Sequence, residues 1–346
     1  MNTKFSAYMK VIKTVKNSRF INHERKEKSH AFSVQMERQG ASGYSQNKYI
    51  WIETFMSWLF TVCAFTAFLA VIAITGYMVV KGVPAICEVG FVDFFFGTVW
   101  QPTAVEPRFG ILNMILTTCI GTFFAILLGV PIGVLTAVFL AEVANEKTSA
   151  LVRPAVELLA GIPSVIYGLL GTILIVPLVA KLELMLFASD SSHVFTGGAN
   201  FLSGVLVLAM MVLPTIITVS ETALRAVPAS YKEASLALGA TRVQTIFRVL
   251  MPAARSGIIT AVVLGFGRAI GEAMAIIMVA GNVVNSPAAF HSVRFLTTGI
   301  VAEMGYASGL HREVLFSIGF VLFCFIMMIN ILLSAILRKG RKENER

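Results

Sequence analysis

The chain has 346 residues, of which 56% are hydrophobic and only 14% are charged, a balance that excludes an ordinary soluble domain. Its formal net charge is +9 at pH 7. Because the basic residues gather in the terminal segments and in alternate loops, the charge needs no nucleic-acid partner to explain it. The four cysteines and five histidines show no metal-ligand spacing, so we predict no metal site.

Residues 1–50 form a basic segment ahead of the first apolar run. This segment and the run after it are both too long for a cleavable secretion signal. Phe5, Tyr8, Ile12 and Val15 recur at helical spacing among lysines, which is typical of a helix lying on anionic membrane lipid. A mobile basic tail explains the same pattern equally well. In both cases we expect a cytoplasmic extension.

Six apolar runs are long enough to cross a bilayer, which takes about 20 helical residues. They lie at 54–80, 111–141, 156–180, 201–220, 256–281 and 314–337. Backbone groups find no water in hydrocarbon, so these runs must be helices, and the short alternating segments of a membrane barrel do not occur. Pro131, Pro163, Pro177 and Pro214 lie inside them and predict kinks. The predicted fold class is an all-α integral membrane protein with six transmembrane helices.

Lysine and arginine predict the orientation of these spans. The N-terminal segment, the loops 142–157 and 221–255 and the C-terminal tail hold ten, two, five and five of them, 22 in all. The three alternate loops hold five: Lys81, Arg108, Lys181, Arg294 and Arg312. Both termini are therefore predicted to be cytoplasmic, with a transmembrane domain at 51–340 and a cytoplasmic tail at 341–346.

The 230–252 loop has the local signals of two short helices separated by a glycine. Ser230 and Glu233 stand three residues apart, as a capping box requires, and a Thr-x-x-Gln sequence repeats that spacing from Thr241. Gly239 lies between the two boxes, where a first helix would end in a left-handed residue. The sequence predicts helix, glycine break and helix, in a loop that faces water.

The fifth apolar run differs from the others because it contains two charges. Arg268 lies about 16 Å into a hydrocarbon core of roughly 30 Å, and Glu272 follows one helical turn later on the same face. A lone charge at this depth costs at least about 2.5–3.5 kcal/mol. One interpretation is an ion pair that fixes the helix in its bundle. The interpretation we favour is a polar path in which Arg268 offers a planar donor fork to an anion. Gly267 and Gly271 form a GxxxG step, where we expect close helix packing.

No G-x-x-x-x-G-K-[ST] phosphate loop, G-x-S-x-G elbow or H-E-x-x-H pair occurs in the sequence. We therefore predict that the chain is not an enzyme and has no ATPase site of its own. Energy for any transport would come from a partner or from an ion gradient.

The 230–252 loop resembles the EAA signature of ABC importer permeases. The matching residues are Glu233-Ala234-Ser235, Gly239 and Val249-x-Met251-Pro252, in which Ser235, Val249 and Met251 are mild departures. In that family this element, here called the coupling loop, seats a short helix in a groove of a cytoplasmic ATPase. The resemblance implies a type I ABC importer permease fold, which is also called MetI-like.

Two further segments resemble the phosphate-specific branch of these permeases. The first runs from Gly267 to Asn282, although Ala273 stands where the family more often has threonine. The second, from Glu157 to Gly168, is similar to PstC-type subunits in particular. The resemblance covers about residues 54–337, which leaves the N-terminal extension outside it.

The resemblance implies a permease subunit of an ATP-driven importer of inorganic phosphate in the bacterial inner membrane. Expected partners are a PstA-like permease, a PstB-like ATPase dimer that binds ATP and Mg, and a PstS-like phosphate-binding protein, with no cofactor in this chain. The residues expected to dock the ATPase are Ser230, Glu233, Ala234, Gly239 and Thr241, and those expected to line the substrate path are Arg268 and Glu272. Alternatives are a PstA-like subunit, a permease for another oxyanion, or an ion-coupled secondary transporter that uses the two charges.

Overall fold

The computed structural model describes residues 51–189 and 191–344. The predicted basic extension at 1–50 and the end of the predicted tail at 341–346 lie outside the described residues. The chain divides into two compact units, Met1–Ile74 and Thr75–Arg346. The described part of the first unit, 51–74, is helical throughout and belongs to a helix with bounds Trp51–Val89.

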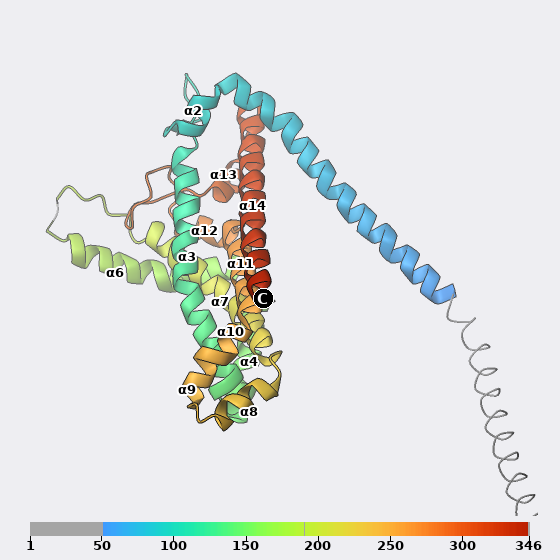
Figure 1. Ribbon diagram of the computed structural model, residues 1–346. Coiled ribbons are helices and arrows are strands. Elements are labelled where there is room, and N and C mark those ends of the chain that lie inside the picture. The colour runs from blue at the N-terminus through green and yellow to red at the C-terminus, as the bar shows by residue number, and fades with distance from the viewer. Residues whose placement is uncertain (1–50, 190, 345–346) are drawn as a thin grey trace, which may run out of the picture. The chain divides into compact units, whose positions relative to one another are not determined.

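The second unit is a helical bundle with its elements in the order shown in Figure 1. After residue 89 come α2 (Phe91–Phe96), β1 (Trp100–Gln101), β2 (Arg108–Phe109), α3 (Leu112–Val138), η1 (Phe139–Val143), α4 (Glu146–Gly161), α5 (Ser164–Leu170), η2 (Gly171–Ile175), α6 (Val176–Phe187) and α7 (Phe201–Arg225). Then follow α8 (Ala229–Ala237), α9 (Arg242–Thr245), η3 (Ile246–Leu250), α10 (Met251–Ala253), α11 (Arg255–Ile270), α12 (Met274–Val279), α13 (Leu296–Glu303) and α14 (Gly309–Asn344). The η elements are π-helical turns.

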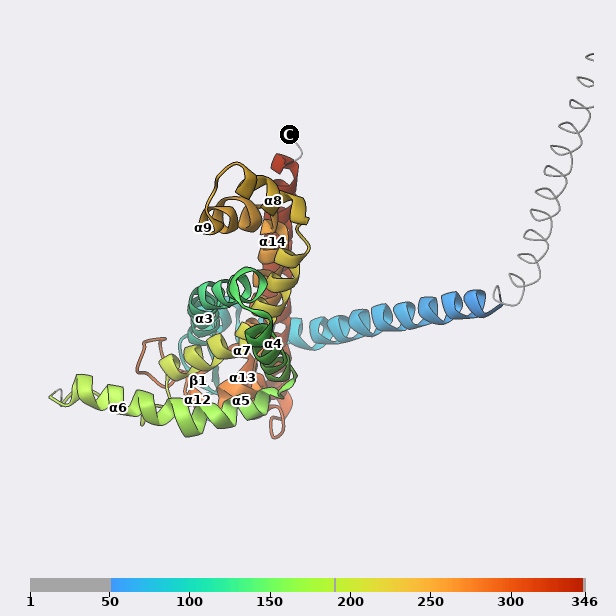
Figure 2. The same cartoon turned by 90° about the horizontal axis from the view of Figure 1, so that it is seen from below.

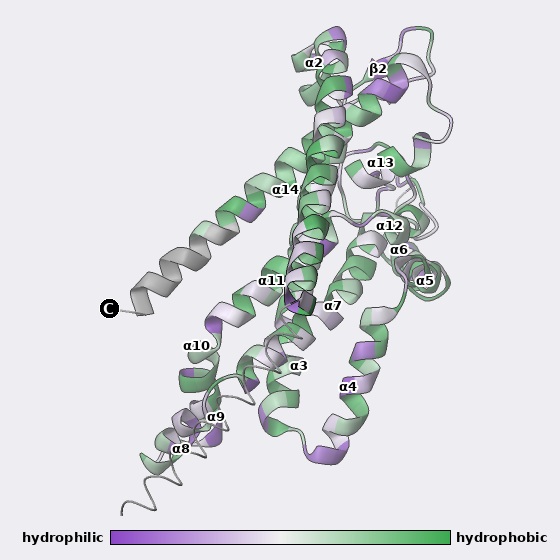
Figure 3. Cartoon of the chain, turned by 90° about the vertical axis from the view of Figure 1, so that its right-hand side faces the viewer, coloured by the Kyte–Doolittle hydropathy of each residue, from purple (hydrophilic) through white to green (hydrophobic). Residues whose placement is uncertain are grey.

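The core of this unit lies between α3, α7 and α11. Their apolar side chains form one buried cluster, which includes Val134 of α3, Ile216 of α7 and Ala269 of α11. A second cluster gathers Trp100 and Phe109 from the antiparallel β1–β2 pair with residues of α13 and α14. Figures 1 and 3 show α2 at one end of α3 and the coupling loop, with α8 and α9, at the other. These are called below the α2 end and the α8 end.

The spans agree with the prediction in part. Within the described residues, five helices are long and apolar enough to cross a membrane: Trp51–Val89, Leu112–Val143, Ser164–Phe187, Phe201–Arg225 and Gly309–Leu332. A sixth exists only if Arg242–Ala253 and Arg255–Ile270, which are bent by 70° to each other, count as one span. Figure 3 shows the spans as mostly hydrophobic, with hydrophilic residues toward both ends of the bundle, on α4 and the coupling loop and around β2.

Two predicted boundaries are wrong. The third span begins at Ser164 rather than at residue 156, because Ile162 is extended before Pro163, as a residue that precedes proline tends to be. The predicted continuous helix at 256–281 is instead broken, since α11 ends at Ile270 and α12 begins only at Met274. The first difference moves α4 out of the span. Figure 2 shows the helical rod that ends in α6 leading away from α3 and α7.

Candidate functional site: an intramembrane break, a coupling loop and a polar pocket

The break between α11 and α12 separates the two predicted path residues. Arg268 lies in the last turn of α11, is half-buried, and donates from Nη1 to the hydroxyl of Thr215 on α7 at 3.1 Å. Glu272 lies in the break and is buried, with 8% of its surface exposed. Its Oε1 accepts the backbone N–H of Ala275 at 2.8 Å and so caps α12. Unwound backbone inside a membrane protein is tolerated where it is buried in protein or lines a cavity.

The Arg268–Glu272 ion pair, which was one of the two interpretations of these charges, is not formed among the described residues. The pairing required one continuous helix, and α11 ends between the two residues. The break is stabilised from a third element, because the Thr297 hydroxyl of α13 donates to the backbone oxygen of Glu272 at 2.6 Å. Arg268 is therefore a half-buried cation with a hydroxyl partner and no carboxylate partner in the described chain.

The expected helix packing at Gly267 and Gly271 is also not found among the residues that the structure describes. A Cβ added at Gly267 meets no described atom within 4 Å, and at Gly271 it meets only the carbonyl oxygen of Gly267. Both glycines are exposed. The face of α11 beside Arg268 is thus open, which leaves room for a substrate or for a second subunit.

The coupling loop confirms the predicted order of helix, glycine break and helix. Gly239 has a φ of +85° and follows α8 in the left-handed conformation. The amide of Gly239 donates to Leu236 O and that of Ala240 to Ser235 O, which is the Schellman pattern. Thr241 then opens α9 with the predicted capping box, in which its hydroxyl accepts from the amide of Gln244 at 3.3 Å.

The other predicted capping box, Ser230 with Glu233, is wrong. The helix α8 begins at Ala229 after Pro228, and no side chain caps it. Because Ser230 is already inside the first turn, its hydroxyl is not placed to accept from the N-terminal amides as a capping residue would. Glu233 and Ala234 are exposed on α8, so both face outward from the loop.

Several large apolar side chains of the coupling loop are exposed alongside its polar ones. Leu238 is 89% exposed and Val243 64%. Tyr231 and Phe247 are exposed as well. Contiguous exposed apolar patches mark protein interaction sites, so these four side chains in one short loop make it a candidate docking surface. Sequence capping signals located this loop but did not indicate which of its side chains point outward.

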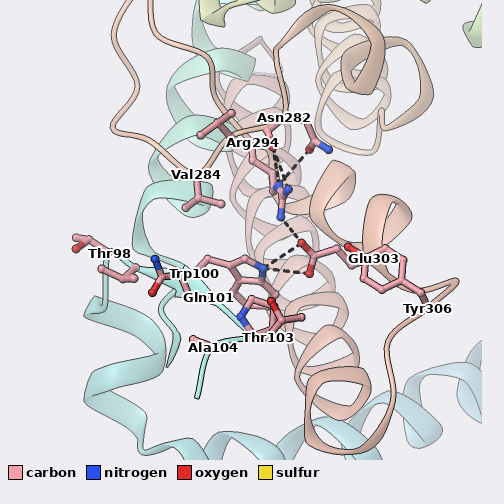
Figure 4. A pocket seen from close by; sticks show the side chains of 13 residues that line it. Thr98, Trp100, Gln101, Thr103, Ala104, Asn282, Val284, Arg294, Glu303 and Tyr306 are labelled. Carbon is pink, nitrogen blue, oxygen red and sulfur yellow. Dashed lines mark hydrogen bonds and ion pairs between the residues drawn. The ribbon is translucent and has the colours of Figure 1, made fainter. Parts of the chain in front are cut away.

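A pocket of about 790 Å³ lies at the α2 end and is centred on a carboxylate. Figure 4 shows Glu303 of α13 accepting from the indole Nε1 of Trp100, at 3.0 and 3.2 Å to its two oxygens, and from Arg294. His311 Nε2 lies 2.8 Å from the same carboxylate. Arg294 also donates to the backbone oxygen of Asn282, at 2.9 Å from Nη2 and 3.1 Å from Nε.

The sequence did not predict this pocket. Of its residues, Arg294 alone was noted there, as a cation of one of the alternate loops. Trp100 and Glu303 are 203 residues apart, so no local motif joins them. Since the guanidinium of Arg294 is already bonded to Glu303 and to Asn282, the cation serves to hold the 282–294 segment against α13. The arrangement is therefore a structural tie at the α2 end of the bundle.

Comparisons with known proteins agree with this architecture. A family model described as "Binding-protein-dependent transport system inner membrane component" matches residues 129–341, which include the coupling loop and the break. The chain is 38% identical over 283 residues to the probable ABC transporter permease protein YqgH of Bacillus subtilis (strain 168), covering 79% of this chain and 88% of that protein. It is 36% identical over 264 residues to the phosphate transport system permease protein PstC of Xylella fastidiosa (strain 9a5c), covering 73% of this chain and 81% of that protein.

A solved structure supports the fold in turn. A bacterial ABC transporter involved in the import of the acidic polysaccharide alginate superposes with a TM-score of 0.50 at 18% identity, covering 79% of this chain and 99% of that chain. The fold and the coupling loop define a multi-pass membrane permease subunit of an ABC transporter. The chain belongs to the family of binding-protein-dependent transport system inner membrane components, and the resemblance to PstC-type permeases is confirmed.

Proposed function

We propose that this chain is the PstC-like permease subunit of an ATP-driven importer of inorganic phosphate. The observation that carries the proposal is Arg268, a half-buried cation with a hydroxyl partner and an open glycine face beside it, in a run that the sequence predicts to lie within the membrane. A guanidinium in a low-dielectric site is a strong and geometrically selective partner for an oxyanion. Relatives named as phosphate permeases support the choice of phosphate.

The second half of the proposal is coupling to an ATPase. The exposed Leu238, Val243 and Phe247 form the apolar face that would enter a groove on a PstB-like ATPase dimer. The left-handed Gly239 sets the angle between α8 and α9. Glu233 and Ala234 of α8 would lie at the contact with the ATPase. ATP and Mg would be bound by that partner, while this chain supplies the contact.

The remaining partners follow from the open surfaces and the charge distribution. A PstA-like permease would pack against this chain and complete the path beside Gly267 and Gly271, with Glu272 shaping the break. The lysines and arginines of the loops 142–157 and 221–255 and of the two terminal segments support a cytoplasmic position for the α8 end and for both termini, in a bacterial inner membrane. A PstS-like binding protein would then deliver phosphate at the α2 end.

The test is phosphate uptake by the reconstituted complex of the two permeases, the ATPase dimer and the binding protein. We expect Arg268→Ala to abolish uptake and Arg268→Lys to retain part of it, because lysine keeps the charge but not the planar fork. Arg312→Ala removes an exposed cation of α14 and is the matched control, expected to transport normally. Full uptake by an assembled Arg268→Ala complex would refute the path role. Stronger competition by sulfate or molybdate than by phosphate would reassign the substrate to another oxyanion.

A further inference from the structure

Two side chains of α8 turn away from its exposed surface. In α8, all of which the structure describes, no residue is buried, and only Lys232 and Ser235 are half-buried. The Ser235 hydroxyl lies 2.9 Å from that of Thr245, which belongs to the same loop. Lys232 instead reaches a residue that is 90 positions earlier in the chain. It is therefore the side chain that joins α8 to a transmembrane span.

The partner of Lys232 is Glu142, in the π-helical turn η1 that continues α3 at the α8 end. The Lys232 Nζ donates to Glu142 Oε2 at 2.6 Å. The glutamate side chain is only 11% exposed, whereas the lysine is 45% exposed. A carboxylate largely withdrawn from water needs a partner, so Glu142 holds the middle of α8 against η1 through Lys232.

The η1 turn is held from a second direction by a basic residue of α7. Arg225 donates from Nη2 to the carbonyl of Leu140 at 2.8 Å, one of the terminal carbonyls that a helix leaves unpaired. Arg225 also pairs with Glu221 at 2.9 Å, and Glu221 pairs with Arg153 of α4 at 2.6 Å. The π-helical turn thus joins α3, α4, α7 and α8. Such turns occur frequently at functional sites.

We propose that the Lys232–Glu142 ion pair is the link through which a displacement of α8 reaches the end of α3. Both are positioning residues for transport, because neither lies near the break that would meet substrate. This inference rests on the proposed function, in which α8 is seated on an ATPase. It assigns the two residues a role beyond that docking contact.

The rest of the coupling loop has its own attachment to the bundle. Ile246 and Leu250 of η3 are buried in one apolar cluster with Ala137 and Val138 of α3. This cluster holds the loop in place whether or not the ion pair forms. Variants of the pair are therefore expected to fold and to bind the ATPase, while α8 itself loses its direct connection to α3.

The experiment uses the purified complex of permeases and ATPase with the phosphate-loaded binding protein. We expect Lys232→Glu and Glu142→Lys each to reduce the stimulation of ATP hydrolysis by the loaded binding protein about fivefold or more, the lower end of typical coupling between sites. Basal hydrolysis and co-purification of the ATPase are expected to stay unchanged. The double charge reversal is expected to restore stimulation, and Lys232→Arg to retain it.

Matched controls come from the start of α4. Glu146→Lys and Lys147→Glu reverse exposed charges within five residues of Glu142 and are expected to leave stimulation unchanged. Normal stimulation in both single reversals of the pair would overturn the inference, and so would a double reversal that assembles but does not recover. Loss of ATPase co-purification in the single variants would make the pair part of the docking contact and overturn the transmission role. A wild-type complex that binds no ATPase would instead refute the proposed function, so ATPase co-purification with the wild-type complex is measured first.

Discussion

Gly239 allows the geometry of the coupling loop to be tested by substitution without a steric collision. Its φ is +85°, and a Cβ added there meets no described atom within 4 Å. The whole cost of a substitution is therefore conformational. For an ordinary L-residue the left-handed conformation costs roughly 1–2 kcal/mol. The cost is larger for a β-branched residue and smaller for asparagine, which adopts this conformation more readily.

Three variants follow as a graded series. We expect Gly239→Asn to keep most of the stimulation of ATP hydrolysis by the loaded binding protein, Gly239→Ala to lose part of it, and Gly239→Val to lose most. Since about 1–2 kcal/mol changes an equilibrium by a factor of roughly 5–30, the fraction of loops in the docking geometry falls by up to that factor. The assay is ATP hydrolysis by the purified complex, with and without the loaded binding protein.

Gly161, the last residue of α4, provides the control. A Cβ there also meets no described atom within 4 Å, but its backbone is not left-handed, so Gly161→Val is expected to have little effect on stimulation. Equal losses in all three Gly239 variants would refute the conformational reasoning, because they would indicate that the partner simply needs the space a side chain fills. Wild-type stimulation in Gly239→Val would refute the role of the break altogether.

Three more predictions concern the break and the pocket. Glu272→Gln keeps an oxygen that can accept from the Ala275 amide, so we expect its thermal stability to stay unchanged while phosphate uptake falls. Glu272→Ala should lower both the thermal stability and the uptake. Unchanged uptake in the glutamine variant would show that Glu272 only caps α12. Gly168→Ala places a Cβ 2.9 Å from the Cα of Ala275. We expect this overpacking to destabilise the folded protein by about 1–3 kcal/mol and to lower its melting temperature. An unchanged melting temperature would contradict this prediction. Trp100→Phe removes one hydrogen-bond donor to the buried Glu303 carboxylate. We expect this loss to lower the free energy of unfolding by about 1–3 kcal/mol. No change in thermal unfolding would contradict the structural role of the pocket.

The features that the sequence predicts well are those set by neighbouring residues. Long apolar runs locate the spans because hydrocarbon requires helices of sufficient length. Gly239 and Thr241 mark the end of one helix and the start of the next, since the left-handed conformation and the capping box each depend on a few adjacent residues. The same reasoning fails at Ser230 because Pro228 starts the helix two residues earlier than the capping spacing suggests.

The features that it misses depend on distant segments. The break after Ile270 interrupts a run whose composition favours a continuous helix, and it is held by Thr297 of α13. The Glu303 pocket joins a strand, a loop and two helices, and Arg294 on its own suggests only an exposed cation. In both places the buried polar groups hydrogen-bond with residues that are distant in the sequence, so residue spacing does not predict these contacts.

The packing around Ile216 connects the two ends of the proposed mechanism. Ile216 of α7 is fully buried, and a Cβ added at Gly133 of α3 would lie 2.7 Å from its Cγ2, while one added at Gly265 of α11 would lie 3.0 Å from its Cγ1. The adjacent Thr215 accepts the hydrogen bond of Arg268. Because a close-packed interior does not absorb a shift by compression, a displacement of α3 delivered from α8 must move α7 and α11 as well. Arg268 would then move together with α7, to which Thr215 ties it, so that in the proposed mechanism the place of this cation along the path would follow the state of the coupling loop.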